Sequence, residues 1–220
     1  MPENTTKRAL IADDHHLYRS GLSLLLKDHL GFTQVYEASS LDGALDCLEN
    51  SPGLDLALFD LSMPGMSGGA CLAEVRAQHP NTKLAVVSAS EDKADVLAVI
   101  GGGLNGFMPK TLSNDQIIGA LRDILGGRIF IPNMLSMTSL EKLAQPVPAA
   151  RKASASVQEN RLKDALTPRQ RDVFALVCTG MTNKEIGEKL EISEGTVKVH
   201  ISAMLMIFGL RNRAEFLSLR

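Results

Sequence analysis

Three apolar runs in the first half of the chain end in charged residues. One run ends in the acid pair Asp13-Asp14, another in Asp60, and a third in Lys110. If these runs are strands of one parallel sheet, the charged residues meet at its carboxyl edge, where open α/β sheets place their chemistry. An aspartate can attack a phosphoryl group while neighbouring carboxylates hold a metal ion and a lysine neutralises charge. The pattern therefore predicts a metal-assisted phosphoryl acceptor centred on Asp60.

The acidic residues also suit Mg²⁺, which prefers oxygen ligands and usually takes one or two carboxylates. Asp14 and Asp60 could bind the ion directly, and Asp13 could hold a metal-bound water. The backbone carbonyl of Ser62 is a candidate further ligand. Ser88 ends a fourth apolar run, so its hydroxyl could donate to a phosphoryl oxygen. Mg²⁺ is thus the cofactor that the sequence favours.

Each of these residues also has a plainer explanation. Asp13 and Asp14 could cap the helix that follows them, and Asp60 could be a turn aspartate. Ser88 could be a strand-end hydroxyl and Lys110 a solvated lysine. Taken singly, the plain explanations outweigh the functional ones by roughly three to one, as for any short motif. Taken together they do not explain why all these residue types stand at strand ends of one sheet.

The elements that must position these residues alternate between strand-like and helix-like patterns. The predicted strands are Arg8–Asp13, Gln34–Ala38, Leu54–Asp60, Lys83–Ser88 and Gly106–Pro109. The predicted helices are His16–Leu30, Leu41–Asn50, Gly68–Gln78, Lys93–Gly101 and Asn114–Leu125. Such alternation is typical of a parallel sheet covered on both faces. We choose the flavodoxin-like α/β fold with strand order 2-1-3-4-5, because it places the first, third and fifth strands side by side. In the first helix, Leu17, Gly21, Leu24 and Leu25 form the expected apolar face.

The second half of the chain has a different pattern. Residues 128–160 follow a Gly-Gly stop and become rich in Ala, Ser and Pro, so they predict a linker between a domain at 1–127 and one at 161–220. Capping boxes begin at Thr167 and Thr182, and Ser193 caps a third helix. Two short helices joined by a tight turn within a small module predict an all-α helix-turn-helix domain.

Composition narrows the class of protein further. The 220 residues carry a net charge of −2, but residues 1–125 carry −7 and residues 161–220 carry +3. A basic second domain is the one more suited to polyanions. The three cysteines have no CxxC spacing and are typical of buried thiols in a reducing compartment. The chain opens with a short polar segment and contains no apolar run of the roughly 20 residues that cross a bilayer, so we expect a cytoplasmic protein.

The first domain resembles the receiver of two-component response regulators. The segments IADDH, LFDLSMPGMSG, VVSAS and GFMPK match the family's motifs in order and spacing over residues 7–127. The resemblance implies that Asp60 is the phosphoacceptor of a sensor histidine kinase and that Asp13 and Asp14 are the acid pair. It also implies that Ser88 and Lys110 are the functional hydroxyl and lysine. Phe107 falls at the family's aromatic switch position, although a plain core phenylalanine is an equal alternative.

The second domain resembles the LuxR-type helix-turn-helix of the NarL/FixJ subfamily over residues 166–216, which implies binding to double-stranded DNA. On the third helix an apolar stripe is expected to face the core; it comprises Val197, Ile201, Met204, Leu205 and Phe208. The opposite face carries Lys198, Val199 and Ser202, which we expect at base edges in the major groove. Candidate phosphate contacts are Thr182, Asn183, Lys184, Thr196 and His200, followed by Arg211 and Arg213.

Several alternatives remain open at this point. Met206 and Ile207 stand where the family usually carries basic residues, so the protein could act through protein contacts with weakened DNA binding. A Mg²⁺-dependent phosphohydrolase is a further alternative, although Ser62 occupies the place of the second aspartate in those enzymes. For a regulator, the receiver could mask the DNA-binding face, or phosphorylated receivers could pair as a homodimer on two half-sites.

Overall fold

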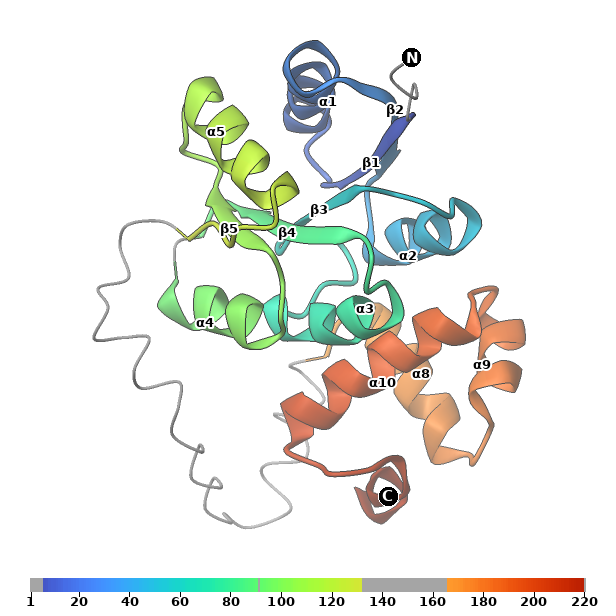
Figure 1. Cartoon of the computed structure of the whole chain (residues 1–220). Helices are drawn as coiled ribbons and strands as arrows, with labels where there is room; N and C mark the ends of the chain where they lie inside the picture. Colours follow the sequence, from blue (N-terminus) through green and yellow to red (C-terminus); the bar gives the residue numbers. More distant parts are fainter. Residues whose placement is uncertain (1–5, 91, 132–165, 220) are drawn as a thin grey trace.

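The computed structural model describes residues 6–90, 92–131 and 166–219, which form two units packed against each other (Figure 1). Strands and helices alternate through the first unit. Its strands are β1 (Lys7–Ala12), β2 (Phe32–Ala38), β3 (Leu56–Asp60), β4 (Lys83–Ser88) and β5 (Gly106–Pro109). Its helices are α1 (His16–Leu30), α2 (Leu41–Asn50), the 3₁₀ turn η1 (Gly69–Cys71), α3 (Leu72–Gln78), α4 (Lys93–Gly101) and α5 (Asn114–Leu125). The predicted α/β class is confirmed.

The five strands form one parallel sheet in the order β2-β1-β3-β4-β5, which confirms the predicted flavodoxin-like topology. One part of that prediction is wrong. β1 and β3 are neighbours, but β4 lies between β3 and β5, so the first, third and fifth strands are not all adjacent. The residue that follows β5 must therefore reach across the end of β4 to approach Asp60. A long side chain such as that of Lys110 can do so.

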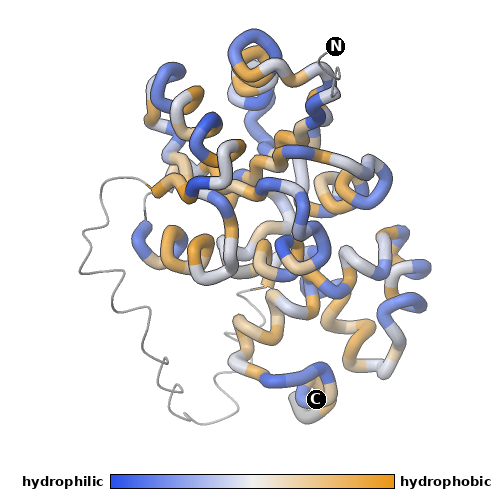
Figure 2. Tube along the Cα trace, in the orientation of Figure 1, coloured by the Kyte–Doolittle hydropathy of each residue, from blue (hydrophilic) through white to orange (hydrophobic). Residues whose placement is uncertain are grey.

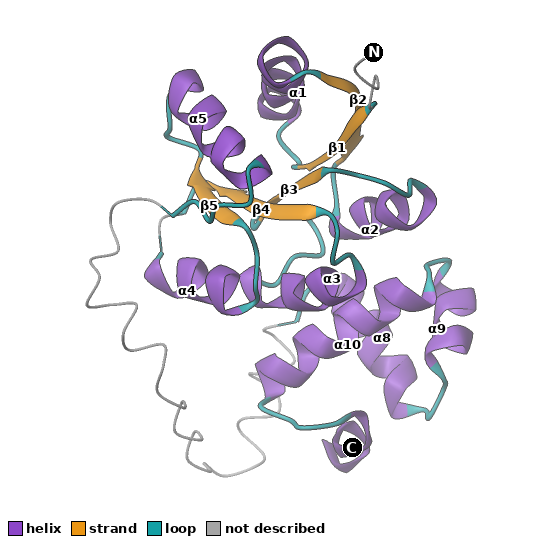
Figure 3. Cartoon of the chain, in the orientation of Figure 1, coloured by secondary structure: helices purple, strands orange, loops and turns teal. Residues whose placement is uncertain are grey.

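Helices cover both faces of the sheet, with α1 and α5 on one side and α2, α3 and α4 on the other (Figure 3). β3 explains why two layers are needed, since all five of its residues are buried. Leu56 and Leu58 pack with α1 and α5, while Ala57 and Phe59 pack with the opposite layer. Most helices alternate between hydrophilic and hydrophobic residues along their turns (Figure 2), as expected of helices that bury one side.

The predicted apolar face of α1 is wrong for Leu17, Gly21 and Leu24, and only Leu25 of that set packs against the core, partly buried. Leu17 and Leu24 are exposed, whereas Leu22, Leu26 and Leu30 are buried against the sheet. The helix contains leucines on more than one side, so its spacing alone does not say which side is inside. The position of the helix on the sheet decides it, because residues four apart on the buried stripe face β1, β3 and α5.

Two leucines of α1 provide a matched pair for a stability measurement. Leu26 is 0% exposed and Leu24 is 60% exposed. We expect Leu26→Ala to lower the free energy of unfolding of the receiver by about 2–5 kcal/mol, because it leaves a cavity in the packed layer. Leu24→Ala should change it by less than about 0.5 kcal/mol. Urea denaturation followed by circular dichroism measures both, and equal effects would contradict the described orientation of α1.

The second unit contains α8 (Pro168–Cys178), α9 (Asn183–Leu190), α10 (Glu194–Phe208) and a 3₁₀ helix η3 (Arg213–Leu219). Both predicted capping boxes are present, at Thr167 and Thr182, and Ser193 caps α10 by accepting from the backbone of Thr196. Glu191 takes a left-handed backbone conformation with φ 55°, which turns the chain from α9 towards α10. The predicted helix-turn-helix is therefore confirmed.

This unit has its own hydrophobic core, to which the predicted stripe of α10 contributes. Val197 and Met204 are fully buried in that core. Phe174, Phe208 and Phe216 contact one another with ring centroids 5.4 to 5.9 Å apart. Three aromatic rings in mutual contact tie η3 to α8 and α10, so the small unit has a core that does not depend on the receiver.

Between the two units the structure describes only the start of the predicted linker. Phe130 forms a parallel bridge with Gly106 and packs against the layer that contains α1 and α5. The rest of the predicted linker, from residue 132 onward, lies outside the described residues.

Candidate functional site

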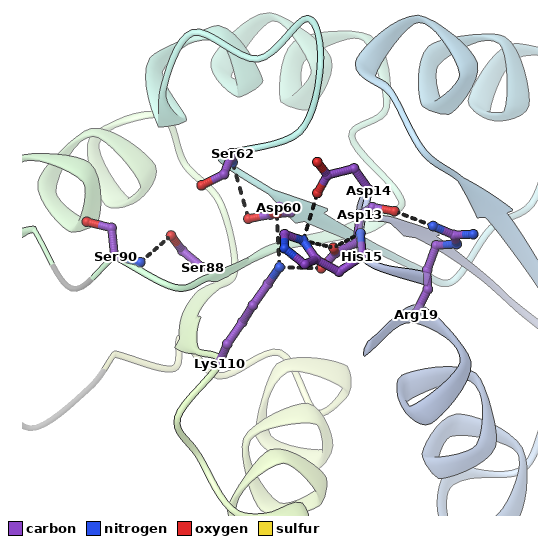
Figure 4. A network of polar contacts seen from close by, with 9 residues as sticks. All are labelled: Asp13, Asp14, His15, Arg19, Asp60, Ser62, Ser88, Ser90 and Lys110. Carbon is purple, nitrogen blue, oxygen red and sulfur yellow. Dashed lines mark hydrogen bonds and ion pairs between the residues drawn. The ribbon is translucent and has the colours of Figure 1, made fainter. Parts of the chain in front are cut away.

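The acidic residues predicted to meet at the sheet edge do so. Asp60 is the last residue of β3 and Asp13 directly follows β1, and these two strands are hydrogen-bonded neighbours. Both carboxylates are about 1% exposed, while Asp14 beside them is partly exposed. Figure 4 shows the three side chains around one small volume, together with Lys110. We call Asp13, Asp14, Asp60 and Lys110 the rim cluster.

Lys110 reaches across the end of β4 and joins the two buried carboxylates. Its Nζ lies 2.7 Å from Asp13 Oδ2 and 2.9 Å from Asp60 Oδ2. Burial by itself would lower the pKa of Lys110, but the hydrogen bonds and charges of Asp13 and Asp60 outweigh it and raise that pKa. The lysine is therefore a fixed positive charge at the position where a phosphoryl group would add negative charge.

Tyr18 belongs to this site although the sequence analysis did not single it out. Its ring lies under Lys110, with Nζ 4.9 Å from the ring centroid. Burial, followed by the charges of Asp13 and Asp60, raises the pKa of Tyr18 to about 12. Its position two residues into α1 carries no chemical signal, so only the packing of α1 against the sheet could reveal it.

The loop after β3 holds the other oxygen of Asp60. The backbone N–H of Ser62 donates to Asp60 Oδ1 at 3.2 Å. Farther along, Gly65 has φ +90°, and a Cβ there would lie 3.1 Å from the Cβ of Leu41. The loop is also tied to α2, because the N–H of Leu41 donates to the carbonyl of Pro64 at 2.9 Å. Asp60 is thus oriented by both its own loop and Lys110.

Ser88, the last residue of β4, and Phe107 of β5 are the remaining residues predicted for the receiver site. The hydroxyl of Ser88 accepts a hydrogen bond from the backbone N–H of Ser90 at 3.1 Å, and Figure 4 shows this pair to one side of Asp60. The ring of Phe107 is fully buried in the layer with α2, α3 and α4. In this conformation Ser88 therefore serves as a local acceptor for the loop after β4, and Phe107 serves as a core residue.

The donor set of the rim cluster fits a divalent cation. Asp13, Asp14 and Asp60 bring three carboxylates together, against one lysine. Their ligand atoms, with a nitrogen of His15, all lie within 4.8 Å of one another. Mg²⁺ binds oxygen ligands and is favoured by a net negative charge, and the three carboxylates supply both. The sequence analysis did not include His15 in this set, although it directly follows the acid pair.

The predicted DNA-reading helix is packed against the receiver. α10 contacts α2, η1 and α3, and Figure 1 shows it lying against α3. Val199 is fully buried within the receiver's own hydrophobic cluster. Ser202 Oγ donates to Glu74 Oε2 at 3.3 Å, and Ser193 Oγ donates to Glu49 Oε1 at 2.5 Å. Of the three residues predicted to meet base edges, Val199 and Ser202 therefore contact the receiver, whereas Lys198 is exposed.

A charged cluster forms the polar part of the same interface. Asp42 of α2 lies between two residues of the second unit, with Oδ1 2.8 Å from His200 Nε2 and Oδ2 2.8 Å from Arg169 Nε. His200 is fully buried. Burial alone would raise the pKa of Asp42, but hydrogen bonds and charges from His200 and Arg169 outweigh it and lower that pKa. We call Asp42, His200 and Arg169 the interdomain clasp.

The remaining predicted DNA contacts are divided between exposed and structural positions. Thr182, Lys184, Lys198 and Arg211 are exposed. Thr196 is buried and hydrogen-bonded to Ser193. Arg213 donates to the side chain of Asn183 and to the carbonyl of Met181, so it joins η3 to the turn before α9.

The two departures near the end of α10 differ in exposure. Met206 is 50% exposed, whereas Ile207 is half-buried against the helical core. Of the two, Met206 alone is available for a contact with another protein, because Ile207 packs inward. Within the described ranges, no helix combines the length and hydrophobicity needed to cross a membrane.

A five-stranded parallel sheet with a buried aspartate and a partly buried lysine at its rim, joined to a helix-turn-helix, defines the class of two-unit regulators that carry a receiver and a DNA-binding module. Residues 9–122 match the model of the response regulator receiver domain, and residues 164–219 match that of the bacterial regulatory proteins of the luxR family. The chain is 35% identical to the glycerol metabolism activator of Pseudomonas putida, covering 94% of this chain and 92% of that protein. It is 32% identical to the nitrate/nitrite response regulator protein NarL of Escherichia coli, covering 94% and 91%.

A solved structure of RcsB from Salmonella enterica, bound to promoter DNA with a phosphomimetic, has the same fold. It is 21% identical, with a TM-score of 0.54 and 98% of each chain covered. The chain belongs to the response regulators that join a receiver to a LuxR-type DNA-binding domain, and it is a homologue of the NarL-type members.

Proposed function

We propose that Asp60 accepts a phosphoryl group from a sensor histidine kinase and that this phosphorylation controls DNA binding and transcription. One observation carries the proposal: a buried carboxylate at the sheet edge contacts Lys110, while the DNA-reading helix of the same chain is covered by the receiver. A site that can gain charge and an output surface that can be uncovered are the two parts of a phosphorylation-controlled regulator.

In the transfer step, a carboxylate oxygen of Asp60 attacks the phosphorus of a phosphohistidine. A P–O bond forms, the P–N bond breaks, and the donor imidazole leaves. Asp13, Asp14, Asp60 and the carbonyl of Ser62 would hold Mg²⁺, which when bound neutralises charge on the phosphoryl oxygens. Lys110 supplies the positive charge opposite, and its two contacts keep it fixed before the reaction begins. Asp60 is the acceptor, so the protein is not proposed as an enzyme, although water could later remove the phosphoryl group.

Ser88 and Phe107 are proposed to transmit the change. The Ser88 oxygen at present accepts a hydrogen bond from the backbone N–H of Ser90, and a phosphoryl group on Asp60 would give its hydroxyl a charged acceptor to which it can donate. Movement of Ser88 would draw the chain between β4 and α4 towards Asp60 and allow Phe107 to repack. Phe107 packs in the same hydrophobic cluster as Val199 of α10. This shared cluster is a physical route from the phosphoryl site to the covered helix.

Of the two regulatory schemes, we propose masking as the first step. Val199, His200 and Ser202 of α10 contact the receiver, and a helix so covered cannot enter the major groove. Opening of the interdomain clasp would uncover it. Pairing as a homodimer on two half-sites would then raise the affinity of the opened protein through bivalency. A cytoplasmic location belongs to the same proposal, because the protein must reach double-stranded DNA and its kinase.

The proposed DNA contacts follow from this scheme. Lys198, Val199 and Ser202 would meet base edges once α10 is free, and Lys184 and Arg211 would contact phosphates from their exposed positions. The proposed domains are 1–127 and 161–220, joined by 128–160, and Phe130 at the start of the joining segment packs on the receiver. The alternative of action through protein contacts rests on Met206, whose half-exposed side chain is the one apolar feature of α10 that favours it.

The proposal is tested with a DNA fragment selected by the phosphorylated protein from a random pool. Acetyl phosphate with Mg²⁺ should add the mass of one phosphoryl group and raise DNA affinity, as measured by fluorescence anisotropy. Lys198→Ala should still be phosphorylated but should bind about 5- to 100-fold more weakly, the loss of one good base contact. Lys27→Ala, an exposed lysine of α1, is the control. Phosphorylation with no gain in affinity would favour action through protein contacts, and unaltered binding by Lys198→Ala would remove Lys198 from the proposed base contacts.

A further inference from the structure

His15 stands at the edge of the rim cluster in an arrangement that helix capping does not explain. It occupies the residue before α1, yet among the described residues its side chain makes no capping hydrogen bond to that helix. Its backbone N–H donates instead to Asp13 Oδ1 at 2.8 Å. Its ring nitrogen Nδ1 lies 2.8 Å from Asp14 Oδ1 and 3.3 Å from Asp13 Oδ1. Figure 4 shows the imidazole among the acidic side chains.

The distances allow the imidazole to belong to the same ion site. Its ligand atom and those of Asp13, Asp14 and Asp60 all lie within 4.8 Å of one another. Opposite ligands of an octahedral ion with bonds of about 2.1 Å stand about 4.2 Å apart, so small side-chain movements suffice to close the site. The side chain of His15 is 66% exposed, which leaves the ring room to turn. Its backbone is held by Asp13, so the ring stays within reach.

A nitrogen donor changes which ions a site prefers. Carboxylates and water suit both Mg²⁺ and Mn²⁺, whereas imidazole is a common ligand of first-row transition ions and is of little use to the harder, oxygen-preferring Mg²⁺. We propose that His15 is a specificity-determining ligand of the metal ion at the rim cluster. Its ring nitrogen would bind the ion beside the carboxylates and favour Mn²⁺ and similar ions over Mg²⁺. The inference rests on the proposed metal-assisted transfer to Asp60 and adds to it the choice of ion.

A matched pair of adjacent histidines tests the inference. His15→Ala removes the proposed ligand, while His16→Ala removes an exposed imidazole of α1 that is not in the donor set. Affinities for Mn²⁺ and Mg²⁺ are measured separately by calorimetry on the full-length, unphosphorylated protein at one fixed neutral pH. Pulsed electron paramagnetic resonance of bound Mn²⁺ reports nitrogen ligation directly, through the coupling of the metal to a ¹⁴N nucleus.

We expect His15→Ala to weaken Mn²⁺ binding about tenfold or more, since even second-sphere partners of a metal contribute that much. The Mg²⁺ affinity should change by less than about twofold, because an oxygen-preferring ion loses little with one imidazole. The ¹⁴N coupling should be present in the wild type and in His16→Ala and absent in His15→Ala.

Two results would overturn the inference. Wild-type protein that binds Mn²⁺ without nitrogen coupling would show that His15 only donates a hydrogen bond to Asp14. An equal loss of Mn²⁺ and Mg²⁺ affinity in His15→Ala would show that the residue merely orients the carboxylates. In either case, Mg²⁺ binding by the wild type leaves the proposed function standing, whereas a wild type that binds neither ion removes the metal-assisted transfer as well.

Discussion

The Asp42→Ala variant is expected to bind DNA without being phosphorylated. Asp42 is the single acidic residue of the interdomain clasp, and its two oxygens contact His200 and Arg169 at 2.8 Å each. Its removal leaves the imidazole of the fully buried His200 without its acidic partner. This loss costs free energy in the closed state but not in the open state, where water can bind the imidazole. The closed state should therefore lose stability relative to the open state, and α10 should become available.

The size of this effect follows from the exposure of the cluster. Removing one member of a hydrogen-bonded charge pair at an interface costs about 2–5 kcal/mol. The Asp42 side chain is 24% exposed, so we expect a value near the lower limit. A shift of about 2 kcal/mol corresponds to a roughly thirtyfold rise in the DNA affinity of the unphosphorylated protein. Phosphorylation should then add much less to the variant than it adds to the wild type, since the mask is already open.

Two measurements check the prediction. Fluorescence anisotropy gives the DNA affinity with and without acetyl phosphate, and hydrogen exchange of residues 194–208 reports whether α10 is released. Asp28→Ala, which changes an exposed aspartate of α1 on the other face of the sheet, is the control and should behave as wild type. An Asp42→Ala protein with wild-type DNA affinity and unaltered exchange would show that the apolar contacts of Val199 hold the mask by themselves.

The Asp60→Asn variant is expected to gain no phosphoryl group and no DNA affinity from acetyl phosphate. An amide oxygen is a far weaker nucleophile than a carboxylate, and the exchange also removes one of the carboxylates available to a cation. The fold should survive, since asparagine has nearly the same shape and Lys110 retains its contact with Asp13 at 2.7 Å. Loss of one charge from a crowded acidic site should leave the thermal stability about equal to that of the wild type or higher.

Intact mass spectrometry after incubation with acetyl phosphate and Mg²⁺ measures the acceptor directly. Asp115→Asn, an exposed aspartate at the start of α5, is the matched control and should be phosphorylated like the wild type. A phosphoryl group that still appears on Asp60→Asn would mean that another carboxylate, Asp13 above all, is the acceptor. Mapping the modified peptide would decide between them.

The rim cluster was predictable because each of its members ends a recognisable apolar run. Once the alternation of strands and helices indicates a parallel sheet, the carboxyl ends of its strands must meet. Asp13, Asp60 and Lys110 are found together for that reason. The apolar face of α1 was not predictable in the same way. Leucines stand on several sides of that helix, and only its place on the sheet selects Leu26 over Leu24.

The role of the α10 surface shows a different limit. Lys198, Val199 and Ser202 were assigned to DNA because they lie opposite the apolar stripe of the helix. Two of the three pack against the receiver, where Val199 joins an apolar cluster and Ser202 meets Glu74, while Lys198 is exposed. A helix surface suited to a groove of DNA is also suited to a groove of protein, so periodicity cannot say which of the two it contacts in a given state.

The sequence by itself determined the two kinds of unit, the strand-end positions of the candidate phosphoryl site and the apolar stripe of the DNA-reading helix. These features depend on local periodicity and on short-range order along the chain, which the sequence records directly. Only the tertiary structure decided the rest: that Tyr18 lies beside Lys110, that His15 turns towards Asp14, and that His200 meets Asp42. The last pair is separated by 158 residues. Contacts of this kind depend on how whole elements dock, which no local pattern encodes.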